Sequence, residues 1–137
     1  MWFRPDPSDL PDASSVHPEL SSARAREALG DAVHRTPIVP LPALRRGGPS
    51  LLGKLENRQE TGSFKARGAL WNVMGLSDEE RARGVVASSS GNHGRALAWA
   101  AGRTGVRATI VMAKNAYPNK IEACRAEGAE VVLAADR

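Results

Sequence analysis

Lys65 is the residue whose type and position first suggest chemistry, because it closes the run Thr-Gly-Ser-Phe-Lys at residues 61–65. Apolar residues then recur at helical spacing from Ala66, which places the lysine in the first turn of a helix. The positive end of the helix dipole disfavours a cation there and favours the free amine, the form that attacks carbonyl carbons. Gly62 permits a sharp turn, and Ser63 is expected to cap the helix. The alternative interpretation is a solvated lysine on a surface helix.

A second run of unusual composition, Ser-Ser-Ser-Gly-Asn-His-Gly at residues 88–94, leads from an expected strand into an expected helix. Successive backbone N–H groups at a helix N-terminus can bind an anion such as a carboxylate. Asn92 and His93 add side-chain donors, and serine hydroxyls can donate, accept or exchange a proton. An ordinary helix cap rich in serine and asparagine is the alternative. The run lacks a G-x-G-x-x-G pattern, so it has no dinucleotide-binding fingerprint.

Apolar periodicity predicts the elements that must position these two runs. Helices are expected around residues 25–35, 66–75, 97–104 and 119–127, and a capping box at residues 77–80 opens a further short helix. Extended segments are expected at residues 38–41 and 51–56, separated by an Arg-Gly-Gly-Pro turn, and buried-type strands at residues 85–88, 108–112 and 131–133. The first helix stops before Thr36-Pro37, and Gly128 ends the last one.

This alternation predicts an α/β fold, with a parallel sheet and helices on both of its faces. Ligands gather at the carboxyl ends of parallel strands, and both runs are expected at that edge. Residues 1–20, rich in Pro, Asp and Ser, are expected to form a flexible leader, and residues 21–137 an incomplete catalytic domain. No element follows the last strand, so the sheet is expected to be truncated with an exposed edge.

Composition narrows the classes of protein that this chain can belong to. It has 137 residues, a net charge of +4 and only 4% aromatic residues, which argues against a nucleic-acid stacking surface. The single cysteine, Cys124, excludes an internal disulfide and fits a reducing compartment. No apolar run could cross a bilayer and no signal-peptide pattern follows Met1, so a cytoplasmic protein is expected. The three histidines lack the spacing of a metal site, and none is expected.

Four stretches of the sequence together resemble a known enzyme family. They are V-H-R-T-P-I, K-L-E-N-R-Q-E-T-G-S-F-K-A-R-G-A, S-S-G-N-H-G-R-A-L-A and M-A-K-N-A-Y-P-N-K-I-E-A-C-R-A-E-G-A-E-V-V-L. They resemble the serine/threonine dehydratase and serine racemase family, which belongs to the fold type II pyridoxal-phosphate enzymes. The likeness runs from about Ala25 to Leu133. It implies the N-terminal part of the tryptophan synthase β-like fold, because family members are more than twice as long and bind the cofactor phosphate further downstream.

The resemblance also implies roles for particular residues. Lys65 would bind pyridoxal 5'-phosphate covalently and Phe64 would pack on the cofactor ring, while Asn92 would bond the ring hydroxyl. The substrate carboxylate would be received by Ser89, Gly91, Asn92 and His93. Ser90 would stand on the cofactor face opposite the lysine, where racemases of the family carry a serine. Arg95 departs from the family, which commonly has glutamine at that position, and Ala113 and Tyr117 replace prolines.

The activity implied by the resemblance is dehydration and deamination of L-threonine or L-serine to a 2-oxo acid and ammonia. Lys65 would remove the α-proton of the substrate. A racemase that uses Ser90 as its second base, a hydroxyaspartate dehydratase and a truncated module without chemistry are the alternatives. The expected partner is a small amino acid rather than nucleic acid or a membrane. A full-length protein of this family is expected to form a homodimer or homotetramer.

Overall fold

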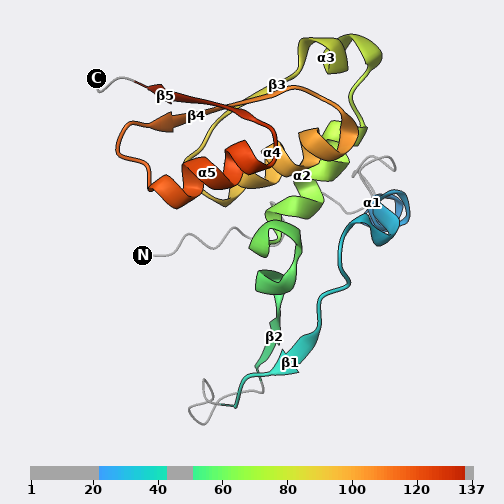
Figure 1. The fold of residues 1–137 in the computed structure, drawn as a ribbon. Helices are drawn as coiled ribbons and strands as arrows, with labels where there is room; N and C mark the ends of the chain where they lie inside the picture. Colours follow the sequence, from blue (N-terminus) through green and yellow to red (C-terminus); the bar gives the residue numbers. More distant parts are fainter. Residues whose placement is uncertain (1–21, 43–50, 135–137) are drawn as a thin grey trace, which may run out of the picture.

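The computed structural model describes residues 22–42 and 51–134, and Figure 1 shows the order of their elements. Helix α1 (Ser22–Leu29) is followed by a 3-10 turn and by strands β1 (Ile38–Pro40) and β2 (Leu52–Lys54). Two 3-10 turns, Glu56–Arg58 and Glu60–Gly62, then lead into helix α2 (Lys65–Met74). The rest of the chain comprises α3 (Asp78–Arg83), β3 (Val85–Ser88), α4 (Asn92–Thr104), β4 (Ala108–Ala113), α5 (Pro118–Ala126) and β5 (Glu130–Ala134).

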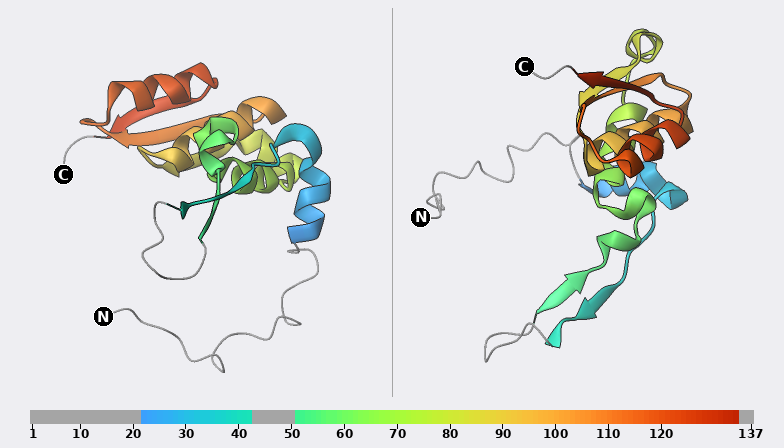
Figure 2. Two further views of the ribbon diagram at one scale, coloured as in Figure 1. Left: turned by 90° about the horizontal axis from the view of Figure 1, so that it is seen from below. Right: turned by 60° about the vertical axis from the view of Figure 1, so that its left-hand side comes forward.

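Strands β3, β4 and β5 form a parallel sheet in that order, as the alternation of strands and helices predicts. Its register pairs Val85 with Ala108 and Ile110 with Val131. The α/β class with a parallel sheet is thereby confirmed. Helices α4 and α5 lie on the same side of this sheet (Figures 1 and 2). Helical cover was expected on both faces, but the described residues place α4 and α5 on one face only.

The side chains of the sheet divide accordingly into a covered and an open face. Ile110 and Met112 point toward the helices and are 0% and 2% exposed. On the opposite face Val86 is 72% exposed and Val132 is 41% exposed. The apolar sequence of β3 predicted burial on both faces, and for Val86 this is wrong within the described structure. The expected exposure of the last strand is confirmed, because β5 is an edge strand.

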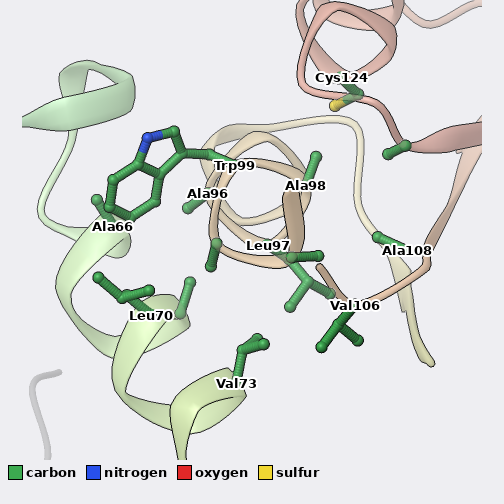
Figure 3. Packing of buried hydrophobic residues seen from close by; sticks show 14 of the residues in the cluster. Ala66, Leu70, Val73, Ala96, Leu97, Ala98, Trp99, Val106, Ala108 and Cys124 are labelled. Atoms are coloured by element: carbon green, nitrogen blue, oxygen red, sulfur yellow. The ribbon is translucent and has the colours of Figure 1, made fainter. Parts of the chain in front are cut away.

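The main core lies between α2 and α4, which pack side by side (Figure 3). Helix α2 contributes Leu70 and Val73, both 2% exposed. Helix α4 contributes mainly alanines around the larger Leu97 and Trp99. Small side chains let the two helix backbones approach closely, so burial of the apolar stripes rather than helix propensity fixes their relative position.

Strands β1 and β2 pair antiparallel in a separate two-stranded sheet, with Val39 opposite Gly53. This sheet extends away from the parallel one in Figure 1. The run that ends in Lys65 therefore follows an antiparallel strand. Its expected position at the end of a parallel strand is wrong, whereas the run at residues 88–94 does follow the parallel strand β3.

The remaining local predictions are largely confirmed. Ser77 and Glu80 form the capping box of α3, with the Ser77 side chain accepting from the Glu80 N–H and the Glu80 carboxylate accepting from Ser77. Gly128 has φ 85° and follows the end of α5. The leader and the Arg-Gly-Gly-Pro turn lie outside the described residues. Among the described helices none is long and apolar enough to cross a membrane.

Candidate functional site

Lys65 begins helix α2, as its place in the sequence predicts. Its Nζ lies 5.0 Å from the centroid of the Phe64 ring, within the range of a cation–π contact. Both side chains are exposed, and Phe64 keeps 59% of its surface. An amine and an aromatic ring therefore stand together on the surface of the described structure, in reach of a ligand.

Ser63 does not cap α2, so the predicted capping bond is wrong. The backbone of Phe64 is already helical (φ −60°, ψ −18°) and Phe64 is the cap residue, without a side-chain bond. Ser63 stands one position earlier in extended backbone, and it is 7% exposed. Its Oγ and the Oγ1 of Thr61 are buried and have no hydrogen-bond partner among the described residues. The predicted turn is confirmed, since Gly62 has φ 71°.

A hydrogen-bonded ion pair supports the first turns of α2. Arg67 donates from Nε to Glu56 Oε2 at 3.0 Å and from Nη2 to Glu56 Oε1 at 2.9 Å. Thr36 donates its hydroxyl to the same carboxylate. The Arg67 guanidinium, opposed in part by burial and assisted by Thr36 and Lys54, lowers the pKa of Glu56 to about 2. Two chain segments distant in sequence are thereby tied to the helix that carries Lys65.

Gln59 completes this polar cluster on the other side of the turn. Its side-chain oxygen accepts from the His34 N–H at 2.9 Å, and its Nε2 donates to the His34 carbonyl at 2.8 Å. The same oxygen accepts from the Glu60 N–H, so Gln59, which is only 4% exposed, makes three side-chain hydrogen bonds. Sequence reasoning missed Thr36, Glu56, Gln59 and Arg67, because the bonds that join them to one another and to His34 span 11 to 33 positions.

The second loop leaves the carboxyl end of β3 and enters α4 at Asn92. Ser89 Oγ accepts hydrogen bonds from the N–H groups of Gly91 and Gly94, at 3.3 and 3.1 Å. Its own hydroxyl hydrogen stays available to donate. Ser90, Asn92 and His93 are exposed. The predicted anion-binding arrangement thus has its donors at the surface, and Ser89 orders the backbone that carries them.

The two glycines of this loop serve different purposes. A Cβ on Gly94 would lie 2.5 Å from the Ser89 carbonyl oxygen and 3.0 Å from Ile110 Cγ2. Gly94 is therefore required for close packing of α4 on the loop, a role that sequence reasoning did not assign. A Cβ on Gly91 would meet no atom within 4 Å. Space is thus open at the residue for which close ligand approach was predicted.

The two loops are joined where α4 begins. Arg95 donates from Nη1 to the carbonyl oxygen of Thr61 at 3.4 Å, across the packed pair α2 and α4. A cavity of about 750 Å³ lies elsewhere, between α1 and α2, and neither Lys65 nor the loop at residues 88–94 lines it. Size alone therefore does not mark the candidate site, since the reactive side chains gather at the joined loops.

Comparisons with known proteins establish the family. Residues 29–137 match the family described as pyridoxal-phosphate dependent enzyme. The chain therefore belongs to this family, whose cofactor is pyridoxal phosphate. Phenylserine dehydratase from Ralstonia pickettii is 42% identical over 135 residues, which cover 94% of this chain and 38% of that protein. L-threonine ammonia-lyase from Thermotoga maritima is 48% identical over 111 residues, which cover 80% of this chain and 27% of that protein.

Solved structures give the same assignment and confirm the predicted resemblance to fold type II pyridoxal-phosphate enzymes. Maize serine racemase superposes with a TM-score of 0.77 at 35% identity, covering 84% of this chain and 35% of the racemase. A pyridoxal 5'-phosphate-dependent aspartate racemase superposes with a TM-score of 0.74 at 40% identity, covering 81% of this chain and 36% of that racemase. The chain thus spans 27% to 38% of the lengths of these four proteins.

The residues present suit a pyridoxal-phosphate site. An exposed amine at Lys65 can react with an aldehyde, and the exposed Phe64 ring beside it offers an apolar face. Gly91 leaves room for close approach, and Asn92 supplies an amide donor. No group of three or more His, Cys, Asp or Glu side chains in the described ranges could hold a metal ion.

Proposed function

We propose that this chain forms the lysine-bearing and carboxylate-binding part of an enzyme that dehydrates L-threonine or L-serine to a 2-oxo acid and ammonia. The observation that carries the proposal is the position of Lys65, exposed at the start of α2 beside the Phe64 ring. Helix α4, which packs on α2, presents the loop at residues 88–94. A nucleophilic amine and a carboxylate receptor are the two protein functions that such a reaction needs.

Lys65 has two tasks in this proposal. Its amine would hold the cofactor through the aldehyde group, and the free amine would accept the proton from the substrate α-carbon. When bound, pyridoxal phosphate withdraws electrons from that carbon and makes the proton removable. Phe64 limits the motion of the lysine and provides a face for the cofactor ring. The Glu56–Arg67 pair holds the helix that carries both residues.

The loop at residues 88–94 orients the substrate by its carboxylate. Ser89 would donate its hydroxyl hydrogen to the carboxylate, Asn92 an amide N–H and His93 a ring N–H. The start of α4 contributes the positive end of its dipole, which favours a carboxylate. Asn92 would also hold the cofactor by donating to its ring hydroxyl. Gly91 keeps the space between these donors open, because no side chain projects from it.

Racemisation is the second candidate function, and it is supported by the position of the Ser90 hydroxyl. Ser89, not Ser90, accepts the bonds from the loop N–H groups, so the Ser90 hydroxyl is not engaged in capping α4. An exposed hydroxyl in this loop can serve as a second proton donor. Three racemases are among the similar solved structures. A dehydratase does not need that second group.

The test is an assay of the full-length protein with pyridoxal phosphate and L-threonine, L-serine or threo-3-hydroxyaspartate. Release of 2-oxo acid and ammonia from threonine or serine supports the proposal, and Lys65→Ala must abolish it. Lys114→Ala changes an exposed lysine of the same chain and serves as the matched control. Interconversion of enantiomers without 2-oxo acid would assign the racemase instead. Absence of both activities in a cofactor-loaded protein would overturn the proposal.

A further inference from the structure

Arg95 carries a positive charge in the first turn of α4, where the helix dipole disfavours a cation. It is the fourth residue of α4, so its guanidinium lies near the positive end of the helix dipole. The side chain is half-buried, and its Nε is buried without a hydrogen-bond partner among the described residues. Among the described residues, Arg95 forms no ion pair. Its bond to the Thr61 carbonyl, at 3.4 Å, is therefore the interaction that directs it.

Thr61, the partner of Arg95, has an unfavourable backbone conformation. It is the one non-glycine residue with positive φ in the described ranges, at φ 60° and ψ 5°. A β-branched residue rarely adopts this conformation, and it persists only when surrounding contacts hold it. The Thr61 hydroxyl is buried and without a partner in the described structure, so it offers no local compensation. Contacts from outside the loop must maintain the conformation, and Arg95 provides one.

These observations place Arg95 between the two loops of the candidate site. Thr61 precedes Lys65 by four positions, and Arg95 follows Asn92 by three positions on the first turn of α4. We infer that Arg95 is a positioning residue that fixes the lysine loop against the start of the carboxylate-binding helix. Its catalytic consequence rests on the proposed function, whereas its structural action on the loop does not. Residues 59–66 should therefore open more readily when the guanidinium is removed.

Hydrogen–deuterium exchange of the full-length protein tests this inference directly. The loop has measurable amides, because Gly62 donates to Gln59 and Ala66 donates to Ser63. Arg95→Met keeps an apolar side chain of similar reach and removes every donor. We expect exchange in residues 59–66 to accelerate about tenfold, the effect of losing one stabilising hydrogen bond. Exchange in β5 should stay at the wild-type rate, because that strand is remote from the bond.

Two comparisons separate loop positioning from general stability. Arg125→Gln removes the same charge from the exposed face of α5, and it should leave exchange in residues 59–66 unchanged. Arg95→Gln, which restores an amide donor, should give an intermediate rate. Equal acceleration in β5 and in residues 59–66, or no acceleration in the loop of Arg95→Met, would overturn the inference. An inactive wild-type protein would instead overturn the proposed function and leave the exchange result standing.

Discussion

Arg67 donates two hydrogen bonds to the Glu56 carboxylate, from Nε to Oε2 at 3.0 Å and from Nη2 to Oε1 at 2.9 Å. The arginine lies two positions after Lys65, and the glutamate belongs to the turn after β2. A planar guanidinium that meets a carboxylate at two points fixes orientation as well as distance. The pair therefore holds the start of α2, and with it the lysine, against the segment before the helix.

Glu56→Gln is expected to destabilise the protein at neutral pH. The change leaves Arg67 in a partly buried place without its carboxylate, which costs about 1–3 kcal/mol of unfolding free energy. The folded-state pKa of Glu56 is about 2, below its ordinary 4.5. The contribution of the carboxylate is therefore complete above pH 4.5 and is lost as pH falls toward 2. Urea unfolding of both proteins at several pH values should show their difference shrinking across that window.

An exposed ion pair provides the control for this prediction. Glu122 accepts from Arg125 at 2.9 Å, but the two side chains are 69% and 51% exposed. Such pairs contribute little, so Glu122→Gln should change the unfolding free energy by less than about 0.5 kcal/mol. If the two substitutions cost the same, or if the Glu56→Gln deficit persists unchanged at pH 2, the special role of the Glu56–Arg67 pair is refuted.

Lys65→Ala should remove the covalent attachment of pyridoxal phosphate in the full-length protein. The amine is exposed at the start of α2, beside the Phe64 ring, where an aldehyde can reach it. The visible absorbance band of the bound cofactor should disappear, while unfolding stability changes little because the side chain is exposed. Borohydride reduction followed by peptide mapping identifies the attachment directly. A label on Lys54 or Lys120 in the wild-type protein contradicts the assignment.

Substitution of the two loop glycines should separate folding from binding. Gly94→Ala puts a Cβ 2.5 Å from the Ser89 carbonyl, and the resulting strain of about 1–3 kcal/mol outweighs the helix propensity gained. Gly91→Ala meets no neighbouring atom, and its φ of −124° suits any residue. We therefore expect a lower melting temperature for Gly94→Ala only, and a higher KM for the amino acid with Gly91→Ala. Equal melting temperatures would show that the loop yields to the clash.

Sequence reasoning reached the elements of this fold because their signals are local. The apolar spacing of α2, the capping box at Ser77 and Glu80, and the glycine at position 128 each report on a few neighbouring residues. Which face of the sheet the helices cover could not be predicted in the same way. An apolar strand such as β3 has the same sequence pattern whether the described chain covers Val86 or leaves it open.

The candidate site likewise has features that local sequence patterns reveal and contacts that only the folded structure reveals. Lys65 and the loop at residues 88–94 could be selected from residue type and position, because a lysine or a serine-rich turn at a helix start has a recognisable pattern. The Glu56–Arg67 pair and the bond from Arg95 to Thr61 could not, because each joins residues brought together by folding. The prediction that Ser63 caps α2 is wrong because the helix begins at Lys65, which makes Phe64 the cap residue.

The 137-residue chain on its own should expose an apolar face that binds hydrophobic dyes. On the open face of the sheet, Val86 of β3 is 72% exposed and Val132 of the edge strand β5 is 41% exposed. We expect fluorescence enhancement of anilinonaphthalene sulfonate, together with concentration-dependent association in sedimentation. Val86→Thr with Val132→Thr should reduce both signals. A monomer with a sharp cooperative transition and no dye binding would refute this prediction.

The hydroxyl of Ser90 is predicted to separate racemisation from elimination. Lys65 reaches one face of the substrate, and elimination from one enantiomer needs only that base. Racemisation needs a second proton donor on the other face, within about 3 Å of the α-carbon. Ser90 is exposed and makes no capping bond, whereas Ser89 accepts from Gly91 and Gly94. The loop N–H groups are therefore bonded by Ser89, and capping of α4 does not account for Ser90.

Ser90→Ala should consequently keep the stability of the full-length protein and most of its 2-oxo acid release from the L-substrate. Conversion of L- to D-amino acid, and any turnover of the D-substrate, should fall far more steeply because the second proton donor is gone. Ser89→Ala is the matched control, since loss of its two accepted bonds should cost about 1 kcal/mol of stability. Chiral chromatography of the remaining substrate, run beside the 2-oxo acid assay, measures both reactions in one sample. A parallel decline of the two reactions in Ser90→Ala would assign the serine to substrate binding and remove its role as the second base.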